Sequence, residues 1–345
     1  MQEVFIEYKQ RDNFADFLKY FLIWMVVLGH FINLYQRSAG PLGGLYNCIY
    51  TFHMPLFVFI SGYFSKRMNT YRRKNIDTLL YPFIIFQILN IVYTLIIPIE
   101  PLKNNFFYPY HQNWYLIALF WWRLFSPYSQ FFKDYVVIGV SVLISLGVGF
   151  FPEWSGFLGL YKTAYFLPFF VLGSYCVDLT KLLDKLMKHK VLWLVLLLVV
   201  LTSVMLLSFN SDALNIINYA FKADLGYDNG IKSLIPRVCA LGVSALMCYA
   251  VLVIMIILYN NLKTRWLKFT GGGTILAFLA HEFIMIPLIR IYSYFGTFFG
   301  FLLCVITSIL VTYILTRKVL VEFLSPLLDL SVLCQKLKIN VYKEQ

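Results

Sequence analysis

Long apolar segments separated by short polar and basic ones run through most of the chain. A helix needs about 20 mainly apolar residues to cross a bilayer, and about ten segments approach this length, the fourth being short. Their approximate limits are 14–36, 45–65, 78–99, 112–126, 134–151, 160–178, 190–209, 235–260, 271–293 and 297–323. The pattern predicts an all-α, polytopic membrane helix bundle of about ten transmembrane helices.

The composition supports a membrane protein and excludes a soluble one. Of the 345 residues, 60% are hydrophobic and 13% are charged, whereas about a quarter of a soluble domain is charged. The net charge of +12 does not indicate a nucleic-acid partner, because the basic residues lie between spans and form no face with interleaved aromatics. Most of the 29 basic residues fall in alternate connecting segments, so the positive-inside rule places both termini in the cytoplasm.

Two regions are expected within this topology. A transmembrane domain covers residues 1–323, and a cytoplasmic tail covers 324–345, where an apolar piece followed by lysines could form an interfacial helix. The six cysteines are scattered and have no metal-like spacing. We therefore expect packing roles for the cysteines and no metal site.

The first span carries a polar stripe. Lys19 and His30 are eleven positions apart, which on a helix puts them within about 20° of one face and about 16 Å apart along the axis. Asp16 and Asn33 lie three residues outside this pair and are expected on the same face. Ionisable groups in a membrane helix are costly and usually functional, so Asp16, Lys19 and His30 are candidate catalytic residues.

A second intramembrane histidine, His53, lies in the next span at a depth where it could approach His30 across a short external hairpin. A neutral imidazole in such a pocket keeps one nitrogen available to accept a proton from a hydroxyl. The alternative is a hydrogen-bonded core residue. Ser61-Gly62-Tyr63, later in the same span, could be tight helix packing of small residues.

Two cytoplasmic stretches are candidates for holding phosphates. The basic cluster from Lys66 to Lys74 serves as a topology signal or as an anion site. The glycines before the ninth span can present backbone N–H groups to a phosphate or act as a hinge, since no lysine follows at P-loop spacing. The donor-binding candidates are Lys66, Arg67, Arg72, Arg73, Gly272, Gly273 and Thr274.

Further polar residues on or near the external side are candidates for substrate binding. Aromatic belts explain Trp114 but not its polar neighbours. His281 and Glu282 are adjacent and point about 100° apart, so only one is expected to face the cavity squarely. The set comprises Asn33, His111, Asn113, Trp114, Arg237, His281 and Glu282.

These stretches together resemble the membrane-bound acyltransferase family 3, within it the fucose 4-O-acetylase-like branch of surface-polysaccharide acetyltransferases. The first span of that family carries a basic residue and, after ten intervening residues, a histidine. Lys19 and His30 match this motif, with lysine where many members have arginine. The other matching motifs are Phe52-His53-Met54-Pro55-Leu56-Phe57, Ser61-Gly62-Tyr63, Asn113-Trp114-Tyr115-Leu116, Phe169-Phe170-Val171-Leu172-Gly173 and Gly273-Thr274-Ile275 leading to His281.

The resemblance implies transfer of an acetyl group from cytoplasmic acetyl-CoA, used as a substrate with no permanently bound cofactor. The acceptor would be a sugar hydroxyl of a cell-surface polysaccharide, such as a capsule or exopolysaccharide, or of its lipid-linked precursor, at a bacterial plasma membrane. His30 would be the general base or a transient acyl carrier and His53 its helper. Lys19 would hold Asp16 or polar groups of the donor.

Two other classes of function remain open at this point. A polytopic transporter or flippase for a glycan-lipid could use the same histidines to relay protons or bind substrate. A membrane scaffold with inert buried polar groups is the third possibility. The discriminating property is chemical, because a transporter needs no thioester and leaves its substrate unmodified.

Overall fold

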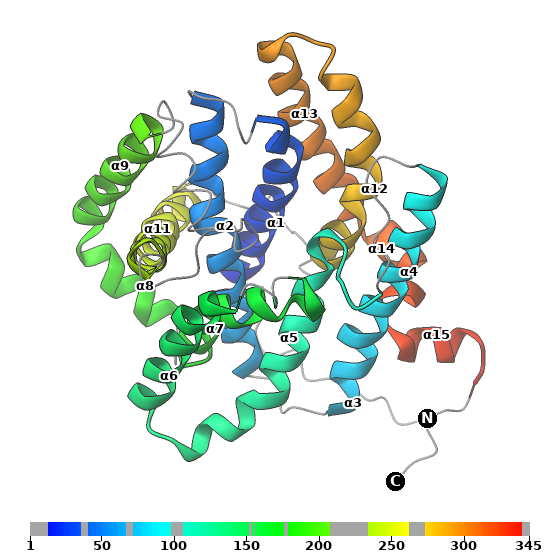
Figure 1. Ribbon diagram of the computed structural model, residues 1–345, viewed down its shortest axis with the longest axis horizontal. Helices are drawn as coiled ribbons and strands as arrows, with labels where there is room; N and C mark the ends of the chain where they lie inside the picture. The colour runs from blue at the N-terminus through cyan, green and yellow to red at the C-terminus, as the bar shows by residue number, and fades with distance from the viewer. Residues whose placement is uncertain are drawn as a thin grey trace.

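The computed structural model describes residues 13–35, 41–66, 72–97, 106–151, 154, 156–175, 179–207, 234–261 and 273–339 (Figure 1). Within these ranges the chain is helical and has no strand. The all-α prediction is therefore confirmed.

The centre of the bundle is α1 (Asn13–Phe31), which packs against α2 (Pro41–Lys66), α12 (Thr274–Tyr292) and α13 (Thr297–Leu315) (Figure 1). Apolar side chains of α1 are fully buried at successive turns, so this helix is enclosed by protein on most of its surface. Its polar side chains consequently face neighbouring helices. The site described below depends on this arrangement.

A second layer covers one side of this centre. A short helix α3 (Arg72–Asn75) leads through a π-helical turn η2 (Ile76–Leu80) into α4 (Tyr81–Ile96). A 3₁₀ turn η3 (His111–Asn113) then opens α5 (Trp114–Phe125), which packs on α4, η2 and α7. The turn η3 also contacts α12, and this brings the start of α5 to the centre of the bundle.

Among the described residues, the helix pair in the most extensive contact is α2 with α7 (Leu160–Tyr175). A Cβ atom on Gly62 would collide with the carbonyl oxygen of Phe170, and one on Gly173 would collide with that of Phe59. Two glycines therefore let the helix backbones touch. This confirms that the Gly62 position of the Ser-Gly-Tyr stretch serves helix packing.

The remaining peripheral helices surround α2 and α7. A 3₁₀ segment η4 (Ser126–Phe131) follows α5 and leads to α6 (Asp134–Gly147), which η5 (Val148–Phe150) extends. Another such turn, η7 (Phe157–Gly159), precedes α7. The helix α6 packs mainly on α7.

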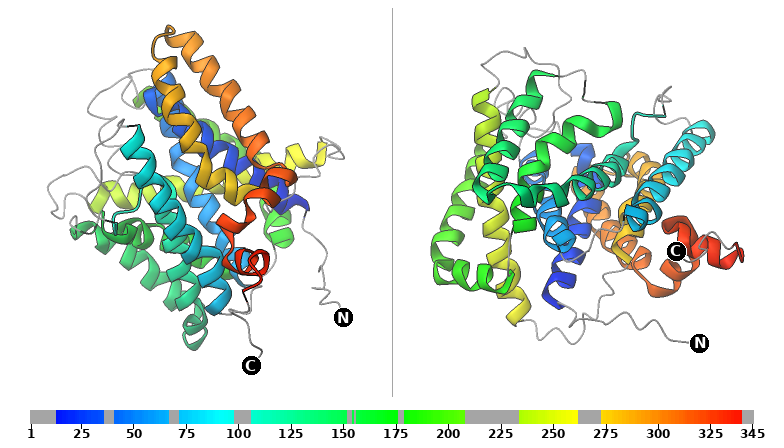
Figure 2. Two further views of the ribbon diagram at one scale, coloured as in Figure 1. Left: turned by 90° about the vertical axis from the view of Figure 1, so that its right-hand side faces the viewer. Right: turned by 90° about the horizontal axis from the view of Figure 1, so that it is seen from below.

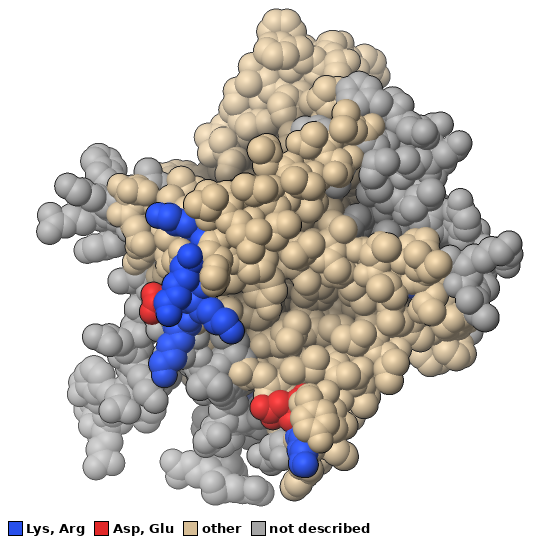
Figure 3. All heavy atoms as spheres, turned by 90° about the vertical axis from the view of Figure 1, so that its left-hand side faces the viewer, with Lys and Arg blue, Asp and Glu red and all other residues tan. Residues whose placement is uncertain are grey.

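A bent pair of helices closes the opposite side. The helix α8 (Leu179–Lys188) meets α9 (Lys190–Leu207) at 79°, and both pack on α11 (Leu234–Asn261). Several basic side chains gather in a patch on this side of the molecule, and a smaller group of charged side chains lies apart from it on a mostly uncharged surface (Figure 3). The exposed lysines of α8 and the start of α9 are Lys181, Lys185, Lys188 and Lys190. This amphipathic pattern is typical of a helix lying at a membrane surface.

The C-terminal part of the described chain forms two short helices, α14 (Lys318–Leu328) and α15 (Leu330–Lys336). Figure 2 shows them on the side of α4, and α14 contacts α4, α12 and α13. The last predicted span, 297–323, is therefore divided between α13 and α14. The tail predicted to begin at 324 starts within α14.

Seven helices among the described residues are long and apolar enough to cross a membrane, and the bent pair α8–α9 gives an eighth. The segment predicted at 134–151 is a shorter apolar helix, and the one at 112–126 contains the 12-residue helix α5. A helix thus occurs in each of the predicted segments. The total of ten spans and the cytoplasmic position of both termini remain predictions.

Candidate active site

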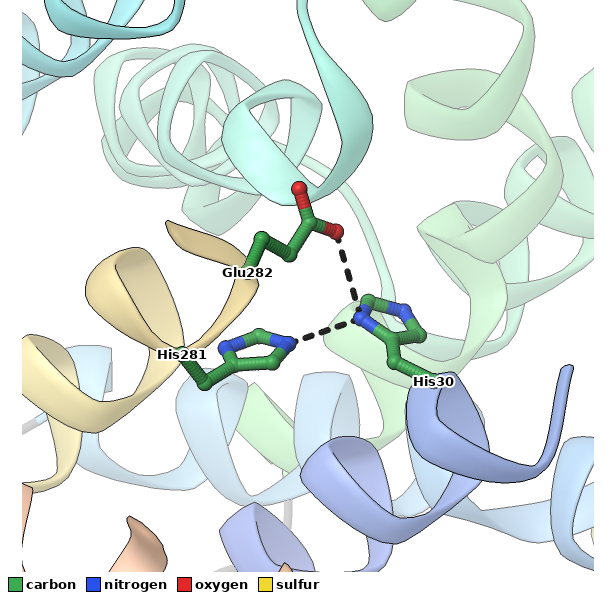
Figure 4. Close-up of side chains that lie close together, drawn as sticks. All are labelled: His30, His281 and Glu282. Carbon is green, nitrogen blue, oxygen red and sulfur yellow. Dashed lines mark hydrogen bonds and ion pairs between the residues drawn. The ribbon is translucent and has the colours of Figure 1, made fainter. Parts of the chain in front are cut away.

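Three side chains from α1 and α12 meet at the end of the polar stripe that lies in the last turn of α1 (Figure 4). His30 Nδ1 lies 2.8 Å from His281 Nε2 and 3.3 Å from Glu282 Oε1. The His281 side chain is fully buried and Glu282 is almost fully buried, while His30 is partly exposed. A carboxylate and two imidazoles are therefore held together inside the helix bundle.

Local packing determines where these residues meet. Gly29 precedes His30, and a Cβ at this position would lie 3.3 Å from Tyr50 Cε2 of α2, so a glycine allows close approach of the two helices. His281 and Glu282 both reach the same nitrogen of His30. The expectation that only one of them faces the site is wrong, because the flexible Glu282 side chain offsets the 100° between adjacent helical positions.

The hydrogen bonds assign the tautomers. His281 Nδ1 lies 2.8 Å from the carbonyl oxygen of Ala277, which only accepts, so Nδ1 carries the proton and Nε2 of neutral His281 accepts. His30 Nδ1 must then donate to His281, and the lone pair of His30 lies on Nε2. The carboxylate of Glu282 beside His30 Nδ1 favours the imidazolium that forms when Nε2 takes up a proton. A base oriented and stabilised in this way follows the logic of a Ser-His-Asp triad.

A third histidine approaches Glu282 from η3. His111 Nδ1 lies 3.5 Å from Glu282 Oε2. The backbone of His111 has φ +41°, a left-handed conformation that is uncommon for a residue other than glycine. Its neighbours hold it there, because Gln112 donates to the Leu279 carbonyl at 2.9 Å and the Tyr110 N–H donates to Gln87 Oε1 at 3.1 Å. Such strain is commonly found at functional sites.

Asn113 and Trp114, also predicted to bind substrate, have packing contacts. Asn113 Nδ2 donates to Gln87 Oε1 at 3.1 Å. The Trp114 ring stacks on Phe166 with centroids 5.4 Å apart, and Lys162 Nζ lies 5.6 Å from the Trp114 ring centroid. These contacts fix the start of α5 and, with it, His111.

His53 is buried in α2 close to the cluster. Its Nδ1 lies 2.8 Å from the Ile49 carbonyl, so Nδ1 donates and Nε2 carries the lone pair, as in His281. The Tyr50 ring packs edge-on against it with centroids 4.6 Å apart. The prediction that His53 assists catalysis stays a prediction.

The other end of the stripe, near the N-terminus of α1, carries Asp16 and Lys19. Lys19 Nζ lies 3.4 Å from the Phe64 ring centroid and 4.0 Å from Asp16 Oδ1. The expected Asp16–Lys19 pair is thus present at long range. At the other end, α1 stops at Phe31, and Asn33 is exposed in the 3₁₀ turn η1 (Ile32–Tyr35), so it does not continue the stripe.

Arg237 lies apart from the cluster. Its guanidinium donates to the Gly149 carbonyl at 2.8 Å and to the Leu146 carbonyl at 3.4 Å. These carbonyls lie at the end of α6, where a cation complements the helix dipole. The contacts give Arg237 a structural role at this helix end.

The predicted donor-binding residues are only partly covered by the structure. Gly273 caps the start of α12 at Thr274 and packs against the backbone of Thr316. Lys66 ends α2, and Arg72 and Arg73 open α3. Arg67 and Gly272 lie outside the described residues.

The ligand types of a metal site are present among the described residues, because ligand atoms of His30, His281 and Glu282 lie within 4.8 Å of one another. Two nitrogens bound to one tetrahedral zinc ion would be about 3.3 Å apart, given Zn–N distances of about 2.0–2.1 Å. The observed 2.8 Å between His30 Nδ1 and His281 Nε2 is a hydrogen-bond distance. The geometry fits a shared proton better than a shared metal.

Two residues that sequence reasoning missed help to build the site. Tyr50 packs between Gly29 and His53, and its spacing from Tyr46 and His53 is a helical i, i+4, i+7 pattern that could have indicated it. Gln87 is fully buried and bonds to the segment that carries His111. The signal for Gln87 in the sequence was a single glutamine within an apolar span, where a polar side chain is costly.

The chain is similar to known proteins in one short segment and, as a family member, over most of its length. A segment of 59 residues is 46% identical to nodulation protein NolL of Mesorhizobium japonicum and, equally, to that of Sinorhizobium fredii. The match covers 16% of this chain and 16% of each relative. No solved structure gives a significant match. The family described as "Acyltransferase domain" (Acyl_transf_3) matches residues 12–317, nearly the whole chain, and the protein, with its several helices long and apolar enough to cross a membrane, therefore belongs to this family.

Proposed function

We propose that this protein transfers an acetyl group from cytoplasmic acetyl-CoA to a sugar hydroxyl of a cell-surface polysaccharide or of its lipid-linked precursor. The observation that carries the proposal is the hydrogen-bonded set of His30, His281 and Glu282. Such a set suits a general base acting on a hydroxyl. Family membership and the local similarity to a nodulation protein support the reaction class. The proposed location is a bacterial plasma membrane.

In the proposed reaction, His30 Nε2 takes the proton of the acceptor hydroxyl while the oxygen of that hydroxyl attacks the thioester carbonyl carbon. The new C–O bond forms, the C–S bond breaks, and the departing thiolate takes the proton from His30. Glu282 stabilises the intervening imidazolium, since its carboxylate lies 3.3 Å from His30 Nδ1. His281 holds the ring and its tautomer through the 2.8 Å hydrogen bond.

The polar stripe on α1 relates the two proposed substrates to the two sides of the membrane. In the predicted orientation, Lys19 lies toward the cytoplasm, where acetyl-CoA enters, and His30 lies about 16 Å further along the helix. The acceptor would then approach from the external side. Transfer is direct, or it passes through a transient acyl group on His30.

The decisive experiment uses purified protein in liposomes with acetyl-CoA labelled in the acetyl group. Free CoA and protein-bound label are measured for wild type, His30→Ala and a matched control, His189→Ala, whose side chain is exposed between α8 and α9. We expect His30→Ala to reduce thioester cleavage at least about 100-fold and His189→Ala to match wild type.

The outcomes separate the competing explanations. Label retained on the wild-type protein and lost in His30→Ala would favour the covalent route. Wild-type rates in His30→Ala would refute the catalytic role of this residue. Failure of correctly folded wild type to cleave acetyl-CoA with any glycan acceptor would refute the proposed function and favour transport of a glycan-lipid.

A further inference from the structure

A cavity of about 710 Å³ lies between α5, α6 and α7, and we call it the α7 cavity. The helices α5 and α6 both pack on α7 (Figure 1). One face of α7 lines the cavity over the whole helix, through Leu160, Thr163, Ala164, Leu167, Phe170, Val171, Ser174 and Tyr175. At 1.5 Å per residue this face is about 22 Å long. The volume is typical of a ligand site, and the length of the wall suits a long, narrow ligand.

The walls of the α7 cavity are apolar. Among the described residues that line it, none is Asp, Glu, Lys, Arg or His. The hydroxyl groups of Ser141 and Thr163 donate to carbonyl groups of Ile138 and Gly159, at 2.7 Å and 2.9 Å. Trp122 Nε1 donates to the Thr163 carbonyl at 3.1 Å. Because these polar groups are paired within the protein, the ligand surface that complements the walls is hydrocarbon.

The rim of the α7 cavity is also apolar, and it is exposed. Phe125 at the end of α5, Phe132 after η4 and Val140 on α6 all line the cavity and are exposed. Exposed apolar surface on a protein with several apolar spans is a contact surface for lipid. A hydrocarbon chain can therefore enter the cavity from the bilayer.

One end of the α7 cavity lies beside the start of α5. A Cβ atom on Gly159, the residue before Leu160, would lie 2.8 Å from Trp114 Cβ. Trp114 directly follows η3, which carries His111 of the candidate active site. Lys162 Nζ lies 5.6 Å from the Trp114 ring centroid, so a cation is present at this end. A chain that lies along α7 with its head group at the Leu160 end directs that head group toward the candidate active site.

We propose that the α7 cavity binds the hydrocarbon chain of a lipid that carries the acceptor sugar through a phosphate, an inference that rests on the proposed function. The chain lies along α7, the phosphate lies near Lys162 and the sugar extends toward His111. The acceptor is then the lipid-linked precursor and not the finished polysaccharide, because only the precursor has a chain that fills the cavity.

The experiment measures lipid binding to the purified protein in neutral detergent by native mass spectrometry. The probes are undecaprenyl phosphate, undecaprenol, which has the same chain without the phosphate, and phosphatidylglycerol, an anionic lipid with two acyl chains. Ala164→Phe on α7 and Val137→Phe on α6 fill the cavity from two walls, so one variant remains if the other does not fold. The matched control, Val195→Phe, changes an exposed residue of α9 outside the cavity.

We expect wild type to bind undecaprenyl phosphate more tightly than phosphatidylglycerol. Ala164→Phe and Val137→Phe should weaken the binding of undecaprenyl phosphate and of undecaprenol at least about tenfold, the effect of excluding about two CH₂ groups from an apolar site. Val195→Phe should match wild type with all three probes.

A lysine at each end of the α7 cavity tests the direction of the chain. Lys162 lies at the Leu160 end, and Lys133 lies between α6 and η4, whose Ser129 carbonyl accepts a hydrogen bond from Tyr175 at the opposite end. Lys162→Gln should weaken the binding of undecaprenyl phosphate about tenfold, the usual effect of losing a hydrogen bond to a charged group. It should leave undecaprenol binding unchanged, and Lys133→Gln should match wild type with both probes.

Three results would overturn the inference. Unchanged binding of undecaprenyl phosphate in the folded cavity-filling variants would place the chain elsewhere. Equal wild-type affinity for phosphatidylglycerol, lost to the same extent in these variants, would indicate a general phospholipid site. Undecaprenyl phosphate binding that is unchanged in Lys162→Gln, or weakened instead in Lys133→Gln, would remove the head group from the end near His111. Binding is measured without acetyl-CoA, so these results differ from failure of the proposed function, in which wild type does not cleave acetyl-CoA.

Discussion

The two ends of α1 hold their charged groups in different ways. Near the C-terminal end of the helix, His30 has two fixed partners at hydrogen-bonding distance, and both are buried on α12. Near the N-terminal end, Lys19 lies over an aromatic ring and faces Asp16 at 4.0 Å. Fixed tautomers suit proton transfer, whereas a cationic side chain suits the binding of an anion. With His30 as the proposed base and Lys19 as the proposed donor contact, changes at the C-terminal end of α1 should reduce kcat and changes at its N-terminal end should raise KM.

The largest effect is expected for Glu282→Gln. The substitution keeps the shape of the side chain but removes the negative charge 3.3 Å from His30 Nδ1, so the imidazolium loses its stabilisation. We expect kcat for thioester cleavage to fall roughly 10³-fold, with little change in KM for acetyl-CoA. Steady-state rates in liposomes give both constants.

The control for this prediction is Glu322→Gln, which removes a carboxylate from an exposed pair with Lys318 on α14. Its rates should equal those of wild type. A fall in kcat of less than about threefold in Glu282→Gln would mean that Glu282 does not act on His30, and the comparison of the two ends would lose its catalytic half.

The next effect is expected for Lys19, at the other end of the helix. Lys19→Ala should raise KM for acetyl-CoA about tenfold through loss of a charged contact, and kcat should change little. Lys19→Arg should stay within about threefold of wild type, because it keeps the charge in the same position. Titration of acetyl-CoA in the cleavage assay measures both variants. Equal activity of the alanine and arginine variants would exclude Lys19 from the site.

Much of the fold and part of the candidate site were predictable from the sequence. The hydropathy pattern located the helices, and the spacing of Lys19 and His30 placed them on one face of α1. These predictions depend on local periodicity. The placement of Lys19 and His30 on one face holds in the structure because α1 is one continuous helix from Asn13 to Phe31.

The partners of these residues were harder to predict, because they come from distant parts of the chain. The meeting of His281 and Glu282 at one nitrogen depends on side-chain length as well as helical direction. Asn33 does not lie on the polar face of α1, because this helix ends at Phe31, two residues before it.

The smallest effect is expected for His111, which approaches Glu282 from η3. It contacts Glu282 at 3.5 Å with a side chain that is 21% exposed, and a partly exposed ion pair contributes at most about 1 kcal/mol, or about fivefold in rate. Asparagine tolerates a left-handed backbone such as φ +41°, so His111→Asn removes the imidazole without adding strain. We expect kcat to fall by up to about fivefold and thermal stability to stay unchanged. Measured rates and unfolding temperatures for His111→Asn and His111→Gly should agree with each other, since both accept this backbone. A loss as large as that of Glu282→Gln would instead place His111 directly in proton transfer, as a second base beside His30.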